Sequence, residues 1–97
     1  MGKYYLTNKA VSDLANIWDY TFDSWSEKQA DKYYTLLLET CQELADNPLL
    51  GKFYNTVSKD LKGYKISKHV IFYKAISENE IEVIRIIHSM MDLRSIL

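Results

Sequence analysis

The chain ends in a stretch that joins an apolar strand to side chains capable of chemistry, IEVIRIIHSMMDLRSIL. Arg85 stands among Ile and Val, and His88 follows shortly before Met90 and Met91. A guanidinium on a rigid strand can bind an anion, either a phosphate or the carboxylate of a partner protein. The same arginine can instead be a partly buried ion that pairs with a carboxylate or with backbone carbonyls. Both interpretations stay open at this point.

His88 invites a catalytic interpretation, because histidine is the side chain most often used as a general acid or base. Catalysis needs a base, an acid and a group that stabilises developing charge close together, and the only other histidine is His69. Neither histidine nor the single Cys41 stands at a spacing typical of metal ligands. The sequence also contains no P-loop, GxGxxG or GxSxG motif. It therefore predicts no metal and no cofactor, and it favours a structural role for His88.

A series of lysines in the second half of the chain could follow the phosphates of a nucleic acid. Its members are Lys59, Lys62, Lys65, Lys68 and Lys74. Along a strand Lys62 and Lys68 lie on one face and Lys65 on the other, so they form no single cationic stripe. The pattern is more typical of lysines that protect a sheet edge from unwanted pairing. Direct binding to nucleic acid is not expected.

Aromatic side chains are concentrated in the first half of the chain, and there are more of them than a small core needs. They include Trp18, Phe22, Trp25, Tyr33 and Tyr34. We expect most of them in the core. Others can line a groove for a partner, because Tyr and Trp are enriched at interfaces.

Length and composition indicate one globular domain over residues 1–97, with 47% apolar and 26% charged residues. One cysteine cannot form an internal disulfide, and neither a signal peptide nor a membrane span is evident, so the cytoplasm is the expected location. Residues 10–50 carry a net charge of −6 and residues 51–77 a net charge of +5. The folded molecule should therefore have one acidic and one basic side.

The elements that must position these residues follow from periodicity. KYYLT at residues 3–7 predicts a first strand, and a helix is expected near 9–24, with Thr7 or Asn8 as its N-cap. The expected core stripe of this helix is Val11, Leu14, Ala15, Trp18, Phe22 and Trp25. A capping box at Ser26 opens a second helix near 27–46, which ends before Pro48.

The rest of the chain favours strands. Residues 48–60 show no clear period and are predicted to be a loop, and strands are expected near 61–67, 68–76 and 81–88. In the last strand, strict alternation places Ile81, Val83, Arg85 and Ile87 on one face. The order β-α-α-β-β-β predicts an α+β fold, with a helical hairpin packed on an antiparallel sheet and a short C-terminal tail.

Six segments in this order resemble the ParE toxins of the RelE/ParE toxin–antitoxin superfamily. They are YLTNKAVSDLANIWDYT, W, KQADKYY, NPLLGK, HVIFYK and IEVIRIIHSMMD, and together they span nearly the whole chain. The resemblance implies the same β-α-α-β-β-β layout. It also implies a toxin that arrests growth by poisoning DNA gyrase, and a ParD-like antitoxin that wraps a flexible C-terminal segment over it.

The resemblance also suggests site residues. Arg85, His88 and Asp92 match the family's closing pattern, whereas Met90 stands where such chains often carry arginine. The expected target-binding set is Arg85, His88, Met90, Met91 and Arg94, and the expected antitoxin-binding set is Trp18, Phe22, Trp25, Tyr33, Tyr34 and Tyr64. The alternative is a RelE-like ribosome-dependent ribonuclease, with Arg85, His88, Lys62 and Lys65 acting on the phosphate. A chain that has kept only its antitoxin-binding ability is a third possibility.

Overall fold

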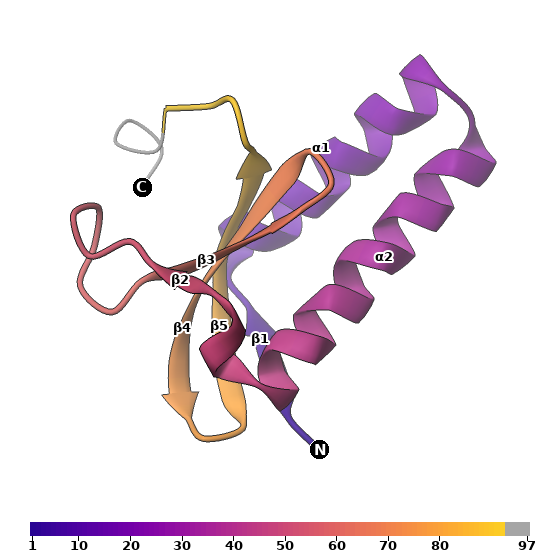
Figure 1. Cartoon of the computed structure of the whole chain (residues 1–97). Helices are drawn as coiled ribbons and strands as arrows, with labels where there is room; N and C mark the ends of the chain where they lie inside the picture. Colours follow the sequence, from indigo (N-terminus) through magenta and orange to yellow (C-terminus); the bar gives the residue numbers. More distant parts are fainter. Residues whose placement is uncertain (93–97) are drawn as a thin grey trace.

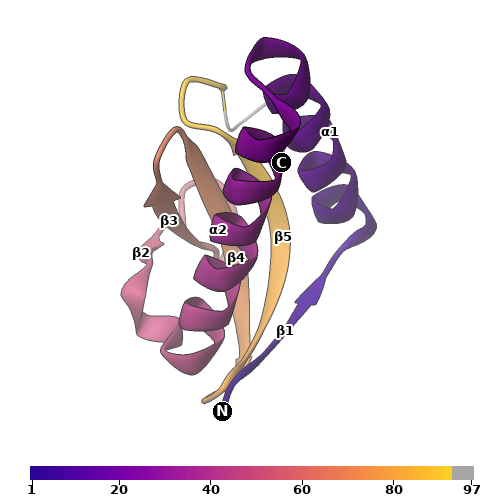
Figure 2. The same ribbon diagram turned by 90° about the vertical axis from the view of Figure 1, so that its right-hand side faces the viewer.

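The computed structural model describes residues 1–92. It contains two helices and five strands: β1 (Lys3–Leu6), α1 (Asn8–Ser24), α2 (Glu27–Asp46), β2 (Lys52–Phe53), β3 (Lys62–Ile66), β4 (His69–Ser77) and β5 (Glu80–His88). A short 3-10 helix, η1 (Pro48–Leu50), precedes β2. The predicted α+β fold is confirmed, and α1 and α2 pack as a hairpin on one face of the sheet (Figures 1 and 2).

The helices begin where the sequence predicts. The Thr7 hydroxyl accepts a hydrogen bond from the Ala10 N–H at 3.1 Å, and the Ser26 hydroxyl accepts one from the Gln29 N–H at 3.1 Å. Each bond satisfies one of the free N–H groups of a first turn. Helix α2 ends at Asp46, ahead of Pro48. The two caps and the proline therefore delimit the hairpin.

The sheet has the order β1-β5-β4-β3-β2 and is mixed. The pairs β2–β3, β3–β4 and β4–β5 are antiparallel, but β1 pairs with β5 in parallel, from Lys3↔Glu80 to Leu6↔Val83. The expectation of a purely antiparallel sheet therefore needs this correction at β1. The segment predicted as a loop, residues 48–60, also contains η1 and the short strand β2.

The core occupies both faces of the sheet. On the helix side, Leu37, Cys41 and Leu44 of α2 pack with residues of β4 and β5 such as Ile71 and Val83. On the other side, Leu61, Val70, Phe72 and Ile87 form a second cluster. Strand β5 is thus covered on both faces, which agrees with its nearly continuous apolar sequence.

The predicted alternation of β5 fails at a β-bulge. Phe72 pairs with Arg85 but Tyr73 pairs with Val83, which leaves Ile84 as the extra residue. A bulge shifts the faces of all later residues by one position. As a result Val83 and Ile86 both join the helix-side core, and Ile87 joins the opposite cluster.

Helix α1 buries a different stripe from the one expected. Ala10 and Leu14 are buried and Ile17 packs against them, while Val11, Phe22 and Trp25 are exposed. Both stripes have helical spacing, and they are offset by one residue. The expected core stripe is therefore largely a surface stripe.

Candidate functional site

Strand β5 extends past the end of β1, and α1 completes its edge. The last β1–β5 pair is Leu6↔Val83, so the backbone groups of the following residues lack a strand partner on that side. The Thr7 hydroxyl donates to the Ile84 carbonyl oxygen at 2.7 Å, and the Ile86 N–H donates to Asp13 Oδ2 at 3.0 Å. Side chains from the start of α1 thus take the place of the missing strand.

Arg85 forms a two-point ion pair with the same carboxylate. Its Nε donates to Asp13 Oδ2 at 2.8 Å and its second terminal nitrogen donates to Oδ1 at 2.9 Å. The two side chains are 18% and 10% exposed, and the bonds to Asp13 raise the pKa of the Arg85 guanidinium. Of the two interpretations of Arg85, the structure therefore agrees with the partly buried ion that pairs with a carboxylate, because α1 supplies Asp13.

Asp13 was not among the predicted site residues. In the sequence it stands as one of many acids on an amphipathic helix, and 72 positions separate it from Arg85. A signal was nevertheless present, because Asp13 shares the buried stripe of Ala10 and Leu14. A carboxylate in an apolar helix stripe and one arginine in an apolar strand would both be costly to bury unpaired.

His88 and His69 lie side by side at the end of the sheet. They pair across β4 and β5, their ring centroids are 5.4 Å apart, and the Tyr33 hydroxyl of α2 lies 2.6 Å from His69 Nδ1. Burial and the neighbouring His88 lower the pKa of His69 to about 4. The sequence pattern assigned His69 no role, but in the structure its ring lies between those of Tyr33 and His88 and connects α2 to the sheet.

The two methionines follow at a turn that His88 holds in place. The Met90 N–H donates to His88 Nδ1 at 3.1 Å, the Met91 N–H donates to the His88 carbonyl at 3.0 Å, and the Ser89 N–H donates to the Lys68 carbonyl at 2.9 Å. Met90 is 85% exposed and Met91 is 52% exposed. Arg94, also predicted to bind the target, lies outside the described residues.

The four residues of the ribonuclease alternative are held by different partners. Lys62 is buried, its ammonium donates to the Pro48 carbonyl at 3.0 Å and it lies 4.8 Å from the centre of the Phe53 ring. Lys65 is exposed on β3, and β4 separates this strand from Arg85 and His88 on β5. The expectation that Lys62 serves as an accessible counter-charge is wrong, because it ties η1 to the sheet together with Tyr73, which also donates to Pro48.

The aromatic residues of the helices divide into an exposed and an inward group. Trp25 is 73% exposed, Phe22 is 45% exposed, and Phe22 stacks on Trp18 with ring centroids 5.3 Å apart. Tyr33 instead turns toward His69, and Tyr64 packs against the helix-side core. The structure therefore exposes Phe22 and Trp25, stacks Phe22 on the half-buried Trp18, and places Tyr34 of α2 in the same hollow as Trp18. Tyr33 and Tyr64 face the sheet instead.

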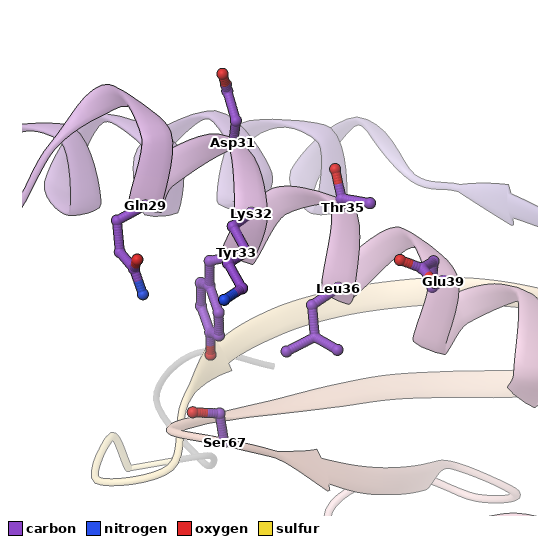
Figure 3. A pocket seen from close by; sticks show the side chains of 8 residues that line it. All are labelled: Gln29, Asp31, Lys32, Tyr33, Thr35, Leu36, Glu39 and Ser67. Carbon is purple, nitrogen blue, oxygen red and sulfur yellow. The ribbon is translucent and has the colours of Figure 1, made fainter.

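Two hollows border α2. The first, which we call the hairpin groove, lies between the two helices and is lined by Val11, Ala15, Trp18, Asp19, Asp31 and Tyr34. The second lies between α2 and the turn from β3 to β4. Figure 3 shows Tyr33 and Leu36 pointing from α2 toward Ser67 of that turn. Both hollows are open to solvent and have partly apolar linings.

Within residues 1–92 no three His, Cys, Asp or Glu side chains come together in a way that could hold a metal ion. Within the same range neither helix is long and apolar enough to cross a membrane.

Comparison with known proteins gives one consistent family. The model of the family described as "ParE toxin of type II toxin-antitoxin system, parDE" matches residues 4–93. Toxin ParE1 of Mycobacterium tuberculosis is 31% identical over 91 residues, covering 94% of this chain and 93% of the relative. Toxin ParE1 of Caulobacter vibrioides is 30% identical over 95 residues, covering 98% and 97%. A solved structure described as the chromosomal ParDE TA system from P. aeruginosa has the same fold, with a TM-score of 0.76 at 19% identity and coverage of 91% and 96%.

Proposed function

Because the chain belongs to the ParE toxin family of type II toxin–antitoxin systems, we propose that it arrests bacterial growth by binding DNA gyrase in the cytoplasm. We further propose that a cognate ParD-like antitoxin neutralises it. The observation that carries the proposal is the match of the family model over residues 4–93. The surfaces described above indicate how each partner would be bound.

The geometry of His88 supports binding over catalysis. Because the Met90 N–H is always a donor, His88 Nδ1 must accept and the neutral ring must carry its proton on Nε2. In that tautomer His88 has no free nitrogen lone pair with which to abstract a proton. Arg85 is neutralised by Asp13 and Lys62 is bonded to Pro48. Cleavage of a phosphodiester would need such charges to converge on one phosphate.

The proposed target-binding surface is the turn at Met90 and Met91. Both side chains are exposed and flexible, which suits contact with an irregular protein surface. His88 supports this turn through its ring nitrogen, and Arg85 supports the strand that leads to it. In this proposal Arg85 and His88 position the surface, and the methionines make the contact.

The proposed antitoxin-binding surface is the exposed aromatic face of the hairpin. Phe22, Trp25 and Tyr34 are exposed, and Trp18 is half-exposed and stacks on Phe22. Contiguous exposed apolar patches mark interaction sites in soluble proteins. A partner that binds only the folded toxin would stabilise it by about 4 kcal/mol at a thousandfold excess over Kd.

Two assays test the proposal. Brief expression in cells, followed by tests of DNA supercoiling, chromosome breakage and message cleavage, distinguishes a gyrase poison from a ribonuclease. We expect Met90→Asp/Met91→Asp to abolish the supercoiling defect, whereas Leu49→Asp, a matched change at an exposed apolar residue of η1, should leave it intact. Message cleavage without any effect on supercoiling would contradict the gyrase proposal.

The second assay addresses the antitoxin. Co-expression with the product of the neighbouring gene should give one complex in gel filtration, with a melting temperature above that of the toxin alone. Trp25→Asp should weaken this complex. If the two proteins elute separately and melt independently, the neighbouring product is not an antitoxin of this chain.

A further inference from the structure

The hairpin groove combines an apolar floor with acidic rims. Val11, Ala15, Trp18 and Tyr34 supply the floor, and the two charged residues that line the groove in the described part of the chain are Asp19 and Asp31. The Trp18 indole N–H donates to Asp31 Oδ1 at 3.0 Å, so the carboxylate is fixed beside the ring. A ligand that covers the floor must therefore approach two exposed carboxylates.

The helical hairpin as a whole is also negatively charged. Residues 8–46 contain eight acidic side chains and three lysines. Asp13 pairs with Arg85, Asp46 accepts from the Gly2 N–H and from Gln42, and Asp31 accepts from the Trp18 indole but has no cation paired with its charge within residues 1–92. The acids at the groove face outward, where they set the sign of the local field.

A groove between two helices with exposed aromatic side chains suits an amphipathic helix whose apolar residues repeat at i, i+3, i+4 and i+7. Resting on the function proposed above, we propose that the antitoxin segment in the hairpin groove is such a helix, with Lys or Arg beside its apolar stripe. An acidic segment would bring like charges together and would remove Asp19 and Asp31 from water without a cation to neutralise them. The groove thus selects its ligand by the sign of its charge.

The basic side of the toxin should instead favour an acidic segment of the antitoxin. Lys52, Lys59, Lys65 and Lys68 are exposed on β2, β3 and the adjoining loops. A tail that covers both regions would need a basic, apolar segment for the hairpin and an acidic segment for the lysines. The two requirements together assign the basic segment of the tail to the hairpin and the acidic segment to the lysines.

The test uses two synthetic helical peptides that share one apolar stripe and differ only in carrying Lys or Glu at the flanking positions. Binding to the full chain is measured by tryptophan fluorescence in a Trp25→Phe background, which leaves Trp18 as the reporter in the groove. We expect the lysine peptide to bind roughly tenfold more tightly at low ionic strength, and we expect salt to reduce this preference. Equal affinity, tighter binding of the glutamate peptide, or no binding of either peptide would overturn the inference.

Charge reversal supplies the matched control. Asp19→Lys/Asp31→Lys should invert the preference between the peptides, whereas Asp23→Lys/Glu43→Lys, with the same net charge on the same helices but outside the groove lining, should preserve it. Asp19→Lys alone keeps the Trp18–Asp31 hydrogen bond. It should change the logarithm of the ratio of the two peptide affinities by about half as much as the double variant does. If the neighbouring gene product forms its complex while the peptides show no charge preference, the proposed function stands and this inference alone fails.

Discussion

The ion pair between Asp13 and Arg85 predicts a large loss of stability when either partner is removed. Arg85→Ala leaves the Asp13 carboxylate, which is 10% exposed, with only the Ile86 N–H as donor. Asp13→Ala removes the carboxylate that neutralises the guanidinium and also leaves the Ile86 N–H without its carboxylate acceptor. Breaking a buried pair costs about 3–5 kcal/mol, and an unsatisfied buried N–H costs about 1–3 kcal/mol. Since both side chains retain some exposure, we expect about 3 kcal/mol for each single variant.

Urea unfolding of the purified variants measures this loss. A change of about 3 kcal/mol corresponds to a fall of more than about 10 °C in the melting temperature of a chain of this size. The double variant should lose about 2 kcal/mol less than the sum of the two single losses, because its second substitution no longer strands a charge. The effect should persist at high salt, since buried pairs are weakly screened.

Lys65→Ala is the control for this experiment, because it removes an exposed cation from a neighbouring strand of the same sheet. It should change the unfolding free energy by less than about 0.5 kcal/mol. If Arg85→Ala is equally mild, the pair behaves like a surface ion pair. Arg85 would then be available to a target, and the structural role assigned to it here would be refuted.

Three further predictions concern other parts of the sheet. Since burial lowers the folded-state pKa of His69 from 6.5 to about 4, the unfolded chain binds the extra proton between these values. The contribution of neutral His69 to the unfolding free energy should be fully present above pH 6.5. It should fall by about 1–2 kcal/mol toward pH 4, after allowance for solvent around the half-buried ring. His69→Phe should remove this loss, which is measured by comparing urea unfolding at pH 7.5 and pH 4.5. Lys62→Met should cost less than about 1.5 kcal/mol, because Tyr73 still donates to Pro48, and should leave growth arrest intact; a folded but harmless variant would favour the ribonuclease alternative. Gly63→Ala should cost about 1–3 kcal/mol in thermal unfolding, because a Cβ there would lie 2.6 Å from the Tyr54 ring and 2.9 Å from the Phe72 ring; an unchanged melting temperature would mean that both rings move aside freely.

Local features of the fold could be predicted because they depend on neighbouring residues. The caps at Thr7 and Ser26 and the stop at Pro48 act within three or four positions, and the structure confirms them. The parallel pairing of β1 could not be predicted, because the sequence of a four-residue strand does not indicate whether it pairs in parallel or antiparallel. The bulge at Ile84 could not be predicted either, since Val83, Ile84, Ile86 and Ile87 are all apolar and fit either face of the sheet.

The candidate site was harder to predict than the fold, for two physical reasons. Its ion pair joins Asp13 and Arg85 across most of the chain, and sequence periodicity reports only on neighbours. On α1, two apolar stripes are offset by one residue, and the larger side chains belong to the outer one. The helical spacing of these large side chains therefore predicted Trp25 in the core, whereas the smaller Ala10 and Leu14 fit the close contact between helix and sheet.

The position of β5 has a consequence for the time at which the protein becomes active. This strand lies between β1 and β4, yet it is synthesised after all the other strands and helices of residues 1–92. Until residues 80–88 emerge, β1 has no neighbour and the hairpin has no complete sheet to cover. Contacts between distant parts of a chain form slowly, because the loop that joins them must first be closed. A chain that ends before β5 should therefore be unable to complete the sheet and the Asp13–Arg85 pair of the folded toxin.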